Sequence, residues 1–153
     1  MNINYQDWVG NSETTQDSIG LAQTLAAAAL FDDTRTFAEG SSLPPLWHWF
    51  YFLPKVPQGR LGSDGHPQRG GFMPPIDLPR RMFAGARLRF RRPLRIGWEA
   101  QRESLIREVT LKEGRSGRLA FVTVHHQIRQ DDELCIEEEQ DIVYREQGAP
   151  VPA

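Results

Sequence analysis

The sequence predicts a single domain of the α+β class, with helices in its first half and an antiparallel sheet in its second. Three observations lead to this prediction. An alanine-rich run with helical spacing lies near the start, an apolar segment bounded by prolines follows it, and four amphipathic strand patterns joined by short turns fill the second half. Helices followed by a run of strands are typical of α+β proteins rather than of alternating α/β folds.

The first helix is expected to run to Leu30, with Ser12 or Thr14 as its N-terminal cap. Its small and apolar side chains recur at helical spacing: Ile19, Ala22, Leu25, Ala26 and Ala29. The helix is expected to end at Asp32 and Asp33. We interpret these two carboxylates as a solvated helix end, and a metal or acid–base site is the alternative.

The second apolar segment, from Leu43 to Pro54, is expected to be the buried central element of the fold. Pro45 suits the first position of a short helix, and Pro54 ends it. Residues 49–52 are four consecutive aromatics, which are too apolar to be exposed on all sides. An antiparallel sheet needs one covered face, and this helix is the available cover.

Four strands are predicted from the alternation of apolar and polar residues: 82–92, 98–112, 118–130 and about 134–144. A glycine-containing hairpin loop at 113–117 and the pair Asp131 and Asp132 connect the last three. The residues expected to face the core are Ala84, Ala86, Leu88 and Phe90 in the first strand, Leu105, Val109 and Leu111 in the second, Ala120, Val122, Val124, His126 and Ile128 in the third, and Ile136, Ile142 and Tyr144 in the fourth.

Between the apolar segment and the strands, residues 61–79 form a long loop that is rich in glycine and proline. Loops of this length without secondary structure are uncommon in compact domains and are often functional. A disordered insertion is the alternative.

This loop and the strand after it resemble the 3-hydroxyacyl-thioester dehydratase type 2 family, whose relatives include MaoC-like, mesaconyl-CoA and itaconyl-CoA hydratases. The matching runs are Leu61-Gly62-Ser63-Asp64-Gly65-His66-Pro67, Gly70-Gly71-Phe72-Met73-Pro74-Pro75 and Leu78-Pro79-Arg80-Arg81-Met82-Phe83-Ala84-Gly85. The resemblance covers roughly residues 8–146. It implies a hot-dog fold, in which an antiparallel sheet wraps a central helix, over residues 1–146, with 147–153 as a linker-like tail.

Hydration of an enoyl thioester needs an acid, a base and donors to the thioester oxygen. In MaoC-like hydratases an Asp and a His placed shortly after a helix supply the acid and the base, and no such pair follows Asp33 here. The resemblance therefore implies the substrate-binding, non-catalytic half of an acyl-CoA hydratase or dehydratase, with the Asp/His pair on a partner chain.

The resemblance also implies that coenzyme A enters as part of the substrate, with no separate cofactor. Arginine forks match phosphate oxygens, and glycine amides can approach an anion closely. The residues expected to bind substrate are Arg80, Arg81, Gly70, Gly71, Phe72 and His66. Arg87, Arg89 and Arg91 are interpreted instead as the solvated face of a strand.

If the chain is catalytic alone, His126 and His48 are the candidate residues. His126 lies on the apolar face of its strand, where burial would lower its pKa and suit it to act as a base. Both histidines have a structural reading as well, since a buried histidine needs only one good hydrogen-bond partner. The run 137–139 of three glutamates is interpreted as a solvated edge strand, and Cys135 is not expected to be a nucleophile.

The composition is ordinary for a globular protein, at 39% hydrophobic and 25% charged residues with a net charge of −2. It gives no reason to expect nucleic acid or a membrane as partner, and one Cys excludes a cysteine-rich metal site. No Lys or Arg precedes Arg35, so no signal peptide and a cytoplasmic location are expected. A homodimer, or a heterodimer with a catalytic hot-dog subunit, is expected to cover the remaining apolar surface.

Two further functions stay open. One is a non-catalytic acyl-CoA-binding or scaffold protein without a hydratase partner. The other is a self-sufficient homodimeric hydratase or thioesterase built on His126 or His48.

Overall fold

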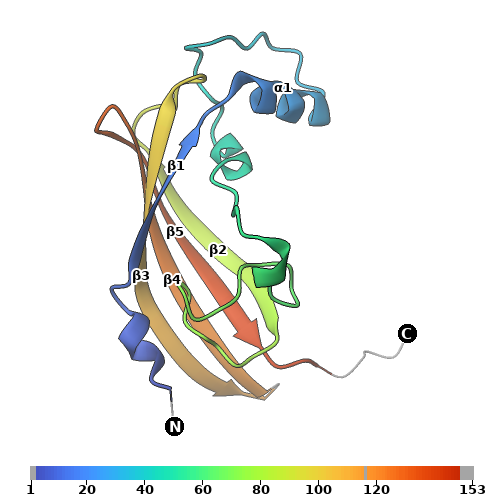
Figure 1. Cartoon of the computed structure of the whole chain (residues 1–153), viewed down its shortest axis with the longest axis vertical. Helices are drawn as coiled ribbons and strands as arrows, with labels where there is room; N and C mark the ends of the chain where they lie inside the picture. The colour runs from blue at the N-terminus through green and yellow to red at the C-terminus, as the bar shows by residue number, and fades with distance from the viewer. Residues whose placement is uncertain (1–2, 116, 149–153) are drawn as a thin grey trace.

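The computed structural model describes residues 3–115 and 117–148. Five antiparallel strands form one sheet in the spatial order β1-β3-β4-β5-β2. Figure 1 shows this sheet as a curved layer, along one face of which lies the chain from α1 to the start of β2. The strands are β1 (Ser12–Ser18), β2 (Arg80–Phe90), β3 (Glu99–Gly114), β4 (Gly117–Gln130) and β5 (Glu133–Arg145).

Among the described residues one α-helix occurs, α1 (Leu21–Leu30), which lies near one end of the sheet (Figure 1). Three short 3-10 turns complete the elements: η1 (Tyr5–Trp8), η2 (Trp47–Phe50) and η3 (Gln58–Arg60). The α+β prediction is confirmed. No helix in the described part of the chain is long and apolar enough to span a bilayer.

Two hydrophobic clusters lie between the sheet and the segment that covers it. The first contains Tyr51 and Phe52 from the covering segment together with Ile96, Ile128 and Ile136 from the sheet side. The second lies under the glycine-rich loop, from which Ile76 and Leu78 pack on the strands. The strand residues of this cluster are Ile106, Val109, Ala120, Val122, Val124, Ile142 and Tyr144. The loop is therefore a structural cover and not a disordered insertion.

The start of the predicted first helix is wrong, because residues 12–18 form strand β1. β1 pairs with β3 over the whole of its length, from Ser12 opposite Leu105 to Ser18 opposite Glu99. The helical spacing begins only at Ile19, and Gly20 is the N-cap of α1. A polar sequence of seven residues carries no period of its own, so the pairing with β3 decides its conformation.

The central helix expected between Pro45 and Pro54 is reduced to the four residues of η2. His48, Tyr51 and Phe52 of this segment are buried, as expected, but Trp49 is 45% exposed. The segment still covers the sheet, and it does so mostly as an extended chain.

The inward face predicted for the second strand is wrong at Leu105, which stands opposite His125 on the outer face. The pairing of β3 with β4 shifts at Arg107, between Ile106 and Glu108, as in a β-bulge. The extra residue changes which side chains face inward. Ile106 and Val109 are buried. Leu111 stands opposite the buried Ala120 and so lies on the inner face, as predicted, but it is 58% exposed. In contrast, the inward faces predicted for the third and fourth strands are confirmed.

Strand β2 is an edge strand. Leu88 and Phe90 stand opposite Glu138 and Ile136 and so lie on the inner face, as predicted, but the burial predicted for this face is wrong. Ala84 and Phe90 are exposed, and Ala86 and Leu88 are half-buried. The run of three glutamates, in turn, does not lie at an edge, because β5 pairs with both β4 and β2. Alternation along β5 exposes residues 137 and 139 partly and buries Glu138.

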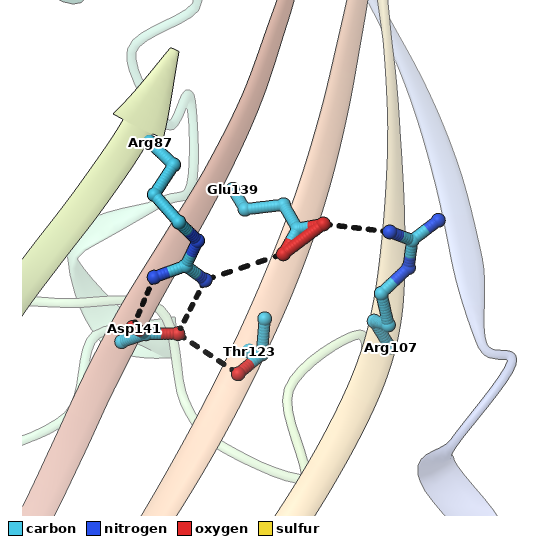
Figure 2. A network of polar contacts seen from close by, with 5 residues as sticks. All are labelled: Arg87, Arg107, Thr123, Glu139 and Asp141. Carbon is cyan, nitrogen blue, oxygen red and sulfur yellow. Dashed lines mark hydrogen bonds and ion pairs between the residues drawn. The ribbon is translucent and has the colours of Figure 1, made fainter.

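Arg87 and Arg89 of β2 point outward, as predicted, and Arg87 takes part in a charge network on the outer face (Figure 2). Arg87 binds Asp141 at 2.7 Å and Glu139 at 3.2 Å, and Arg107 binds Glu139 at 2.6 Å. The hydroxyl of Thr123 donates to Asp141 at 2.9 Å. This network joins β2, β5, β4 and β3. Because the arginines are more than half exposed, each pair adds little to stability.

The β4–β5 turn is formed by Asp131 and Asp132, as predicted, with φ of 49° and 59°. Positive φ at both central residues matches the type I′ hairpin turn, whose twist fits the strands on either side. The tail predicted at 147–153 lies outside the described residues from residue 149 onward.

Candidate functional site

A polar row crosses the inner face of the sheet between the two hydrophobic clusters. Ser104 of β3 stands opposite His126 of β4, which stands opposite Glu138 of β5. All three are buried, with 1%, 8% and 2% of their surface exposed. The hydroxyl of Ser104 lies 2.7 Å from Nδ1 of His126. Glu138 is the only buried carboxylate among residues 3–115 and 117–148.

Both oxygens of Glu138 are occupied by donors. Nε2 of His48 lies 2.9 Å from Oε1, and the indole N–H of Trp49 donates to Oε2 at 2.7 Å. The side-chain amide of Gln140 donates to Oε2 at 3.2 Å. Burial raises the pKa of the Glu138 carboxyl, but these hydrogen bonds outweigh it and hold the pKa below its usual value. The carboxylate is therefore ionised and well satisfied.

The turn that carries His48 and Trp49 is held between two unusual backbone conformations. Leu46 before the turn has φ of 74°, and Phe52 after it has φ of 58°. Bulky residues rarely adopt positive φ, and such positions are retained where the surrounding structure imposes them. Here they direct His48 and Trp49 onto the same carboxylate.

His126 is held neutral in the row. Burial, together with the nearby positive charge of Arg102, lowers its pKa to about 4. The expectation that burial lowers the pKa of His126 is thus confirmed, and the hydrogen bond with Ser104 occupies Nδ1. With so low a pKa, His126 is a weak base that is not protonated near neutral pH.

His48 also lines a groove of about 390 Å³ that lies outside the row. Its walls come from residues 42–45 of the covering segment and from the turn 91–94 after β2. Nδ1 of His48 is buried and has no hydrogen-bond partner in the part of the chain that the structure describes. Of the two histidines predicted from the sequence, His48 is therefore the one with an unused ring nitrogen beside a groove.

Arg81 lies near the other end of the sheet, and His66 lies in the glycine-rich loop that covers this end. Arg81 stands opposite Tyr144 on the inner face, and the guanidinium of Arg69 stacks 4.5 Å above the Tyr144 ring. Burial lowers the pKa of His66, and the positive charge of Arg81 lowers it further, which places the two side chains near each other. The hydroxyl of the fully buried Tyr144 has no partner within the described residues.

The other residues expected to bind substrate are separated from this pair. The amide of Gly70 donates to the carbonyl of Met73 at 2.9 Å. The carbonyl of Gly71 accepts from the indole of Trp8 at 3.1 Å, and Phe72 packs on the second hydrophobic cluster. These contacts tie the loop to the N-terminal segment. Arg80 lies one residue before Arg81, opposite Arg145, so strand alternation places it on the outer face.

The sequence analysis missed Glu138, which it assigned to a solvated edge. One signal could have found it. Glu138 has the same parity along β5 as Ile136, Ile142 and Tyr144, which were correctly placed inward, so alternation alone puts it on the buried face.

Cys135 is buried and its burial raises the pKa of the thiol, which agrees with its exclusion as a nucleophile. No metal-binding group of three His, Cys, Asp or Glu occurs among the described residues.

Comparison with known families decides the affiliation of the chain. The sequence profile of hydroxyacyl-thioester dehydratase type 2 matches residues 46–152. The chain belongs to this family. The mesaconyl-C(4)-CoA hydratase of Chloroflexus aurantiacus is 65% identical over 147 residues, which are 95% of this chain and 52% of that protein. The chain thus spans about half the length of this curated relative.

Solved structures place this dehydratase family member among hot-dog proteins. The ChsH1–ChsH2 complex from Mycobacterium tuberculosis matches with a TM-score of 0.67 at 14% identity, over 92% of this chain and 85% of that one. The C-terminally truncated HadBC (3R-hydroxyacyl-ACP dehydratase) complex from the same organism matches with a TM-score of 0.59 at 15% identity, over 92% and 99%. At these identities the likeness shows the fold alone, and the predicted hot-dog fold is confirmed.

Proposed function

We propose that this chain is the substrate-binding, non-catalytic half of an acyl-thioester hydratase or dehydratase, and that a partner chain supplies the acid and the base. The observation that carries the proposal is the state of Glu138. Its two oxygens already accept three hydrogen bonds within the chain and it is only 2% exposed, so a water molecule or the α-carbon of a substrate has little access to it. His126 is likewise bonded through Nδ1.

The edge of the sheet supports a partner chain. β2 leaves one side of its backbone unpaired within the described residues, and apolar side chains gather beside it. Phe83 is 58% exposed, and Met82, Phe90 and Trp49 are each nearly half exposed. Exposed apolar groups beside an open strand edge mark a site of association. We propose that a catalytic hot-dog subunit docks there, with a homodimer as the alternative.

The loop residues fit the same proposal as one wall of the acyl site. Arg81 stands opposite Tyr144 at the end of the sheet that the glycine-rich loop covers, the positive charge of Arg81 reaches His66 in that loop, and Phe72 packs on the same hydrophobic cluster as Tyr144. Coenzyme A as part of the substrate, the absence of a further cofactor and the cytoplasmic location remain predictions.

A hydration assay with crotonyl-CoA and mesaconyl-CoA tests the proposal. The purified chain is expected to be inactive alone, and activity is expected when a hot-dog chain that carries the Asp/His pair is added. Turnover by the chain alone would overturn the non-catalytic assignment. Binding of acyl-CoA without activity in any such mixture would instead support a scaffold.

A second candidate is a self-sufficient hydratase in which Glu138 orients His48 as the base. The unpartnered Nδ1 of His48 and the adjacent groove favour it. In this case the chain alone hydrates crotonyl-CoA, and His48→Gln abolishes the activity. His126→Gln serves as the matched comparison, because the His126 ring is bonded to Ser104 and does not line the groove.

A further inference from the structure

We propose that Arg81 and Tyr144 form a binding site for a carboxylate group, at the end of the sheet that the glycine-rich loop covers. The guanidinium of Arg81 binds the two carboxylate oxygens, and the hydroxyl of Tyr144 donates a hydrogen bond to one of them. The carboxylate belongs either to a free organic acid or to the far end of the acyl group of a thioester. The second source rests on the proposed function, which supplies acyl thioesters as substrates.

Tyr144 brings an unused donor to this site. The residue is fully buried, and its hydroxyl has no hydrogen-bond partner among the described residues. A buried hydroxyl without a partner costs free energy, and an acceptor oxygen on a ligand removes that cost. Tyr51, which is also buried, shows the ordinary arrangement, because its hydroxyl donates to the carbonyl of Gly20 at 2.8 Å.

Arg81 brings a positive charge that no carboxylate of the chain holds. It stands directly opposite Tyr144 in the pairing of β2 with β5, so the two side chains are neighbours on the inner face of the sheet. Within residues 3–115 and 117–148 Arg81 forms no ion pair. Its guanidinium fork therefore keeps its donors for a ligand.

The second arginine of this region is already used within the chain. The guanidinium of Arg69 lies 4.5 Å from the centre of the Tyr144 ring and donates to two backbone carbonyls of the loop at 2.7 Å and 2.5 Å. It also pairs with Asp64 at 3.3 Å. Asp64 thus balances Arg69, and the charge of Arg81 is left over.

The charges around the Tyr144 hydroxyl select the class of ligand. Burial raises the pKa of Tyr144, and of the charges that act on it Arg81 and Arg69 lower the pKa while Asp64 raises it. Their sum is a single positive charge, which matches a singly charged carboxylate. A phosphate monoester carries about two negative charges, and burying it against a single unbalanced cation is costly.

The surroundings offer a way in for the ligand and an apolar surface for its carbon chain. Arg81 is half-buried on an edge strand, and the nearby His66 is exposed. Arg81 therefore lies between the core and the surface, and a ligand can approach its guanidinium from the side of the loop. Phe72 and Met73 of this loop pack on the hydrophobic cluster that contains Tyr144.

The test compares ligands that differ by one carboxylate. Glutaryl-CoA and valeryl-CoA have acyl chains of equal length, which end in a carboxylate and in a methyl group, respectively. Neither thioester can be hydrated or dehydrated, so calorimetry with the full chain at low salt measures binding alone. Glutaryl-CoA is expected to bind about tenfold more tightly, because a bond between arginine and carboxylate is of the stronger, charge-assisted kind.

Two variants and one control assign this preference to the site. Arg81→Gln is expected to abolish it, and Tyr144→Phe to reduce it several-fold. Tyr144→Phe removes a hydroxyl that has no partner in the described chain, so it keeps the test decisive if Arg81→Gln does not fold. Arg80→Gln is the matched control and should keep the preference, because it removes the same charge from the outer face one residue earlier.

Free glutarate separates the two sources of the carboxylate. A preference for glutaryl-CoA over valeryl-CoA identifies the acyl group as the source. Equal binding of the two thioesters, with binding of glutarate that Arg81→Gln abolishes, identifies a free organic acid. Equal binding of the thioesters without any binding of glutarate would overturn the inference, and so would a preference that survives either variant of the site.

The same experiments distinguish the fate of the site from the fate of the proposed function. Hydratase activity with a partner chain, together with no effect of the carboxylate in any binding experiment, overturns the site and leaves the proposed function intact. Carboxylate binding that depends on Arg81 and Tyr144, without activity in any partner mixture, supports the site and overturns the hydratase role.

Discussion

His126 and Glu138 face each other across β4 and β5 on the buried side of the sheet, with Ser104 next in the same row on β3. The row separates two hydrophobic clusters. Ser104 and His126 bond to each other within it, and Glu138 is also bonded from outside the sheet. His48 and Trp49 from the covering segment satisfy Glu138. The covering segment is therefore fixed to the sheet by polar contacts as well as by apolar packing.

Glu138 should be important for stability whatever its role in function. Glu138→Gln leaves the donors of His48, Trp49 and Gln140 with one acceptor oxygen, and we expect a loss of about 2 kcal/mol in the free energy of unfolding. Urea denaturation measures it. Glu137→Gln is the control, and it should change stability by no more than about 0.5 kcal/mol, since the Arg91 pair is at the surface. Equal effects of the two variants would refute the buried network.

Two tyrosines allow a comparison of a satisfied and an unsatisfied hydroxyl. The hydroxyl of Tyr51 donates to the carbonyl of Gly20 at 2.8 Å and lies 2.7 Å from the hydroxyl of Thr24. Tyr144 has no such partner among the described residues. Tyr51→Phe is expected to lose about 1 kcal/mol, and Tyr144→Phe to be neutral or slightly stabilising. Thermal unfolding of both variants checks this. Destabilisation by Tyr144→Phe would show that water or a neighbouring group satisfies that hydroxyl.

The low pKa of His126 predicts a loss of stability in mild acid. Its pKa is 6.5 in the unfolded chain and about 4 in the folded one, so between these values the unfolded chain binds a proton that the folded chain does not. The stabilisation is fully present above pH 6.5 and is lost as the pH falls towards 4. Over this range we expect the free energy of unfolding to drop by roughly 3 kcal/mol.

Denaturation curves from about pH 7.5 to about pH 4 measure this slope. His126→Gln should remove most of it, and His125→Gln on the outer face should not. The lowered pKa of Glu138 adds a separate loss at lower pH, as that carboxylate becomes protonated, and it is common to all variants in the comparison. Parallel curves for His126→Gln and the wild type would contradict the assignment.

Strand β3 allows a comparison of a buried and an exposed apolar side chain on the inner face of the sheet. Ile106 is fully buried and Leu111 is largely exposed, although the sequence pattern alone placed Leu111 in the core. Ile106→Ala is expected to cost about 3 kcal/mol through the cavity it leaves, and Leu111→Ala less than about 1 kcal/mol. Chemical denaturation of the pair measures the difference. A larger cost at Leu111 would mean that its side chain is more deeply covered than its 58% exposure indicates.

The sequence by itself determined the class of fold, four of the five strands and the inward faces of β4 and β5, because alternation along a strand is a local property that neighbouring side chains reveal. It also determined the family, through the ordered glycines and prolines of the loop. It singled out His48 and His126, though without a reason to connect them.

Only the tertiary structure decided the rest. Residues 12–18 form strand β1 because they pair with β3. The bulge at Arg107 interrupts the alternation along β3, so that odd-numbered residues face inward after it and even-numbered residues before it. The carboxylate that meets His48 lies 90 residues further along the chain. Contacts between distant segments depend on register and on the path of the covering chain. Neither is encoded in a local pattern, and burial of Glu138 becomes acceptable only once those contacts exist.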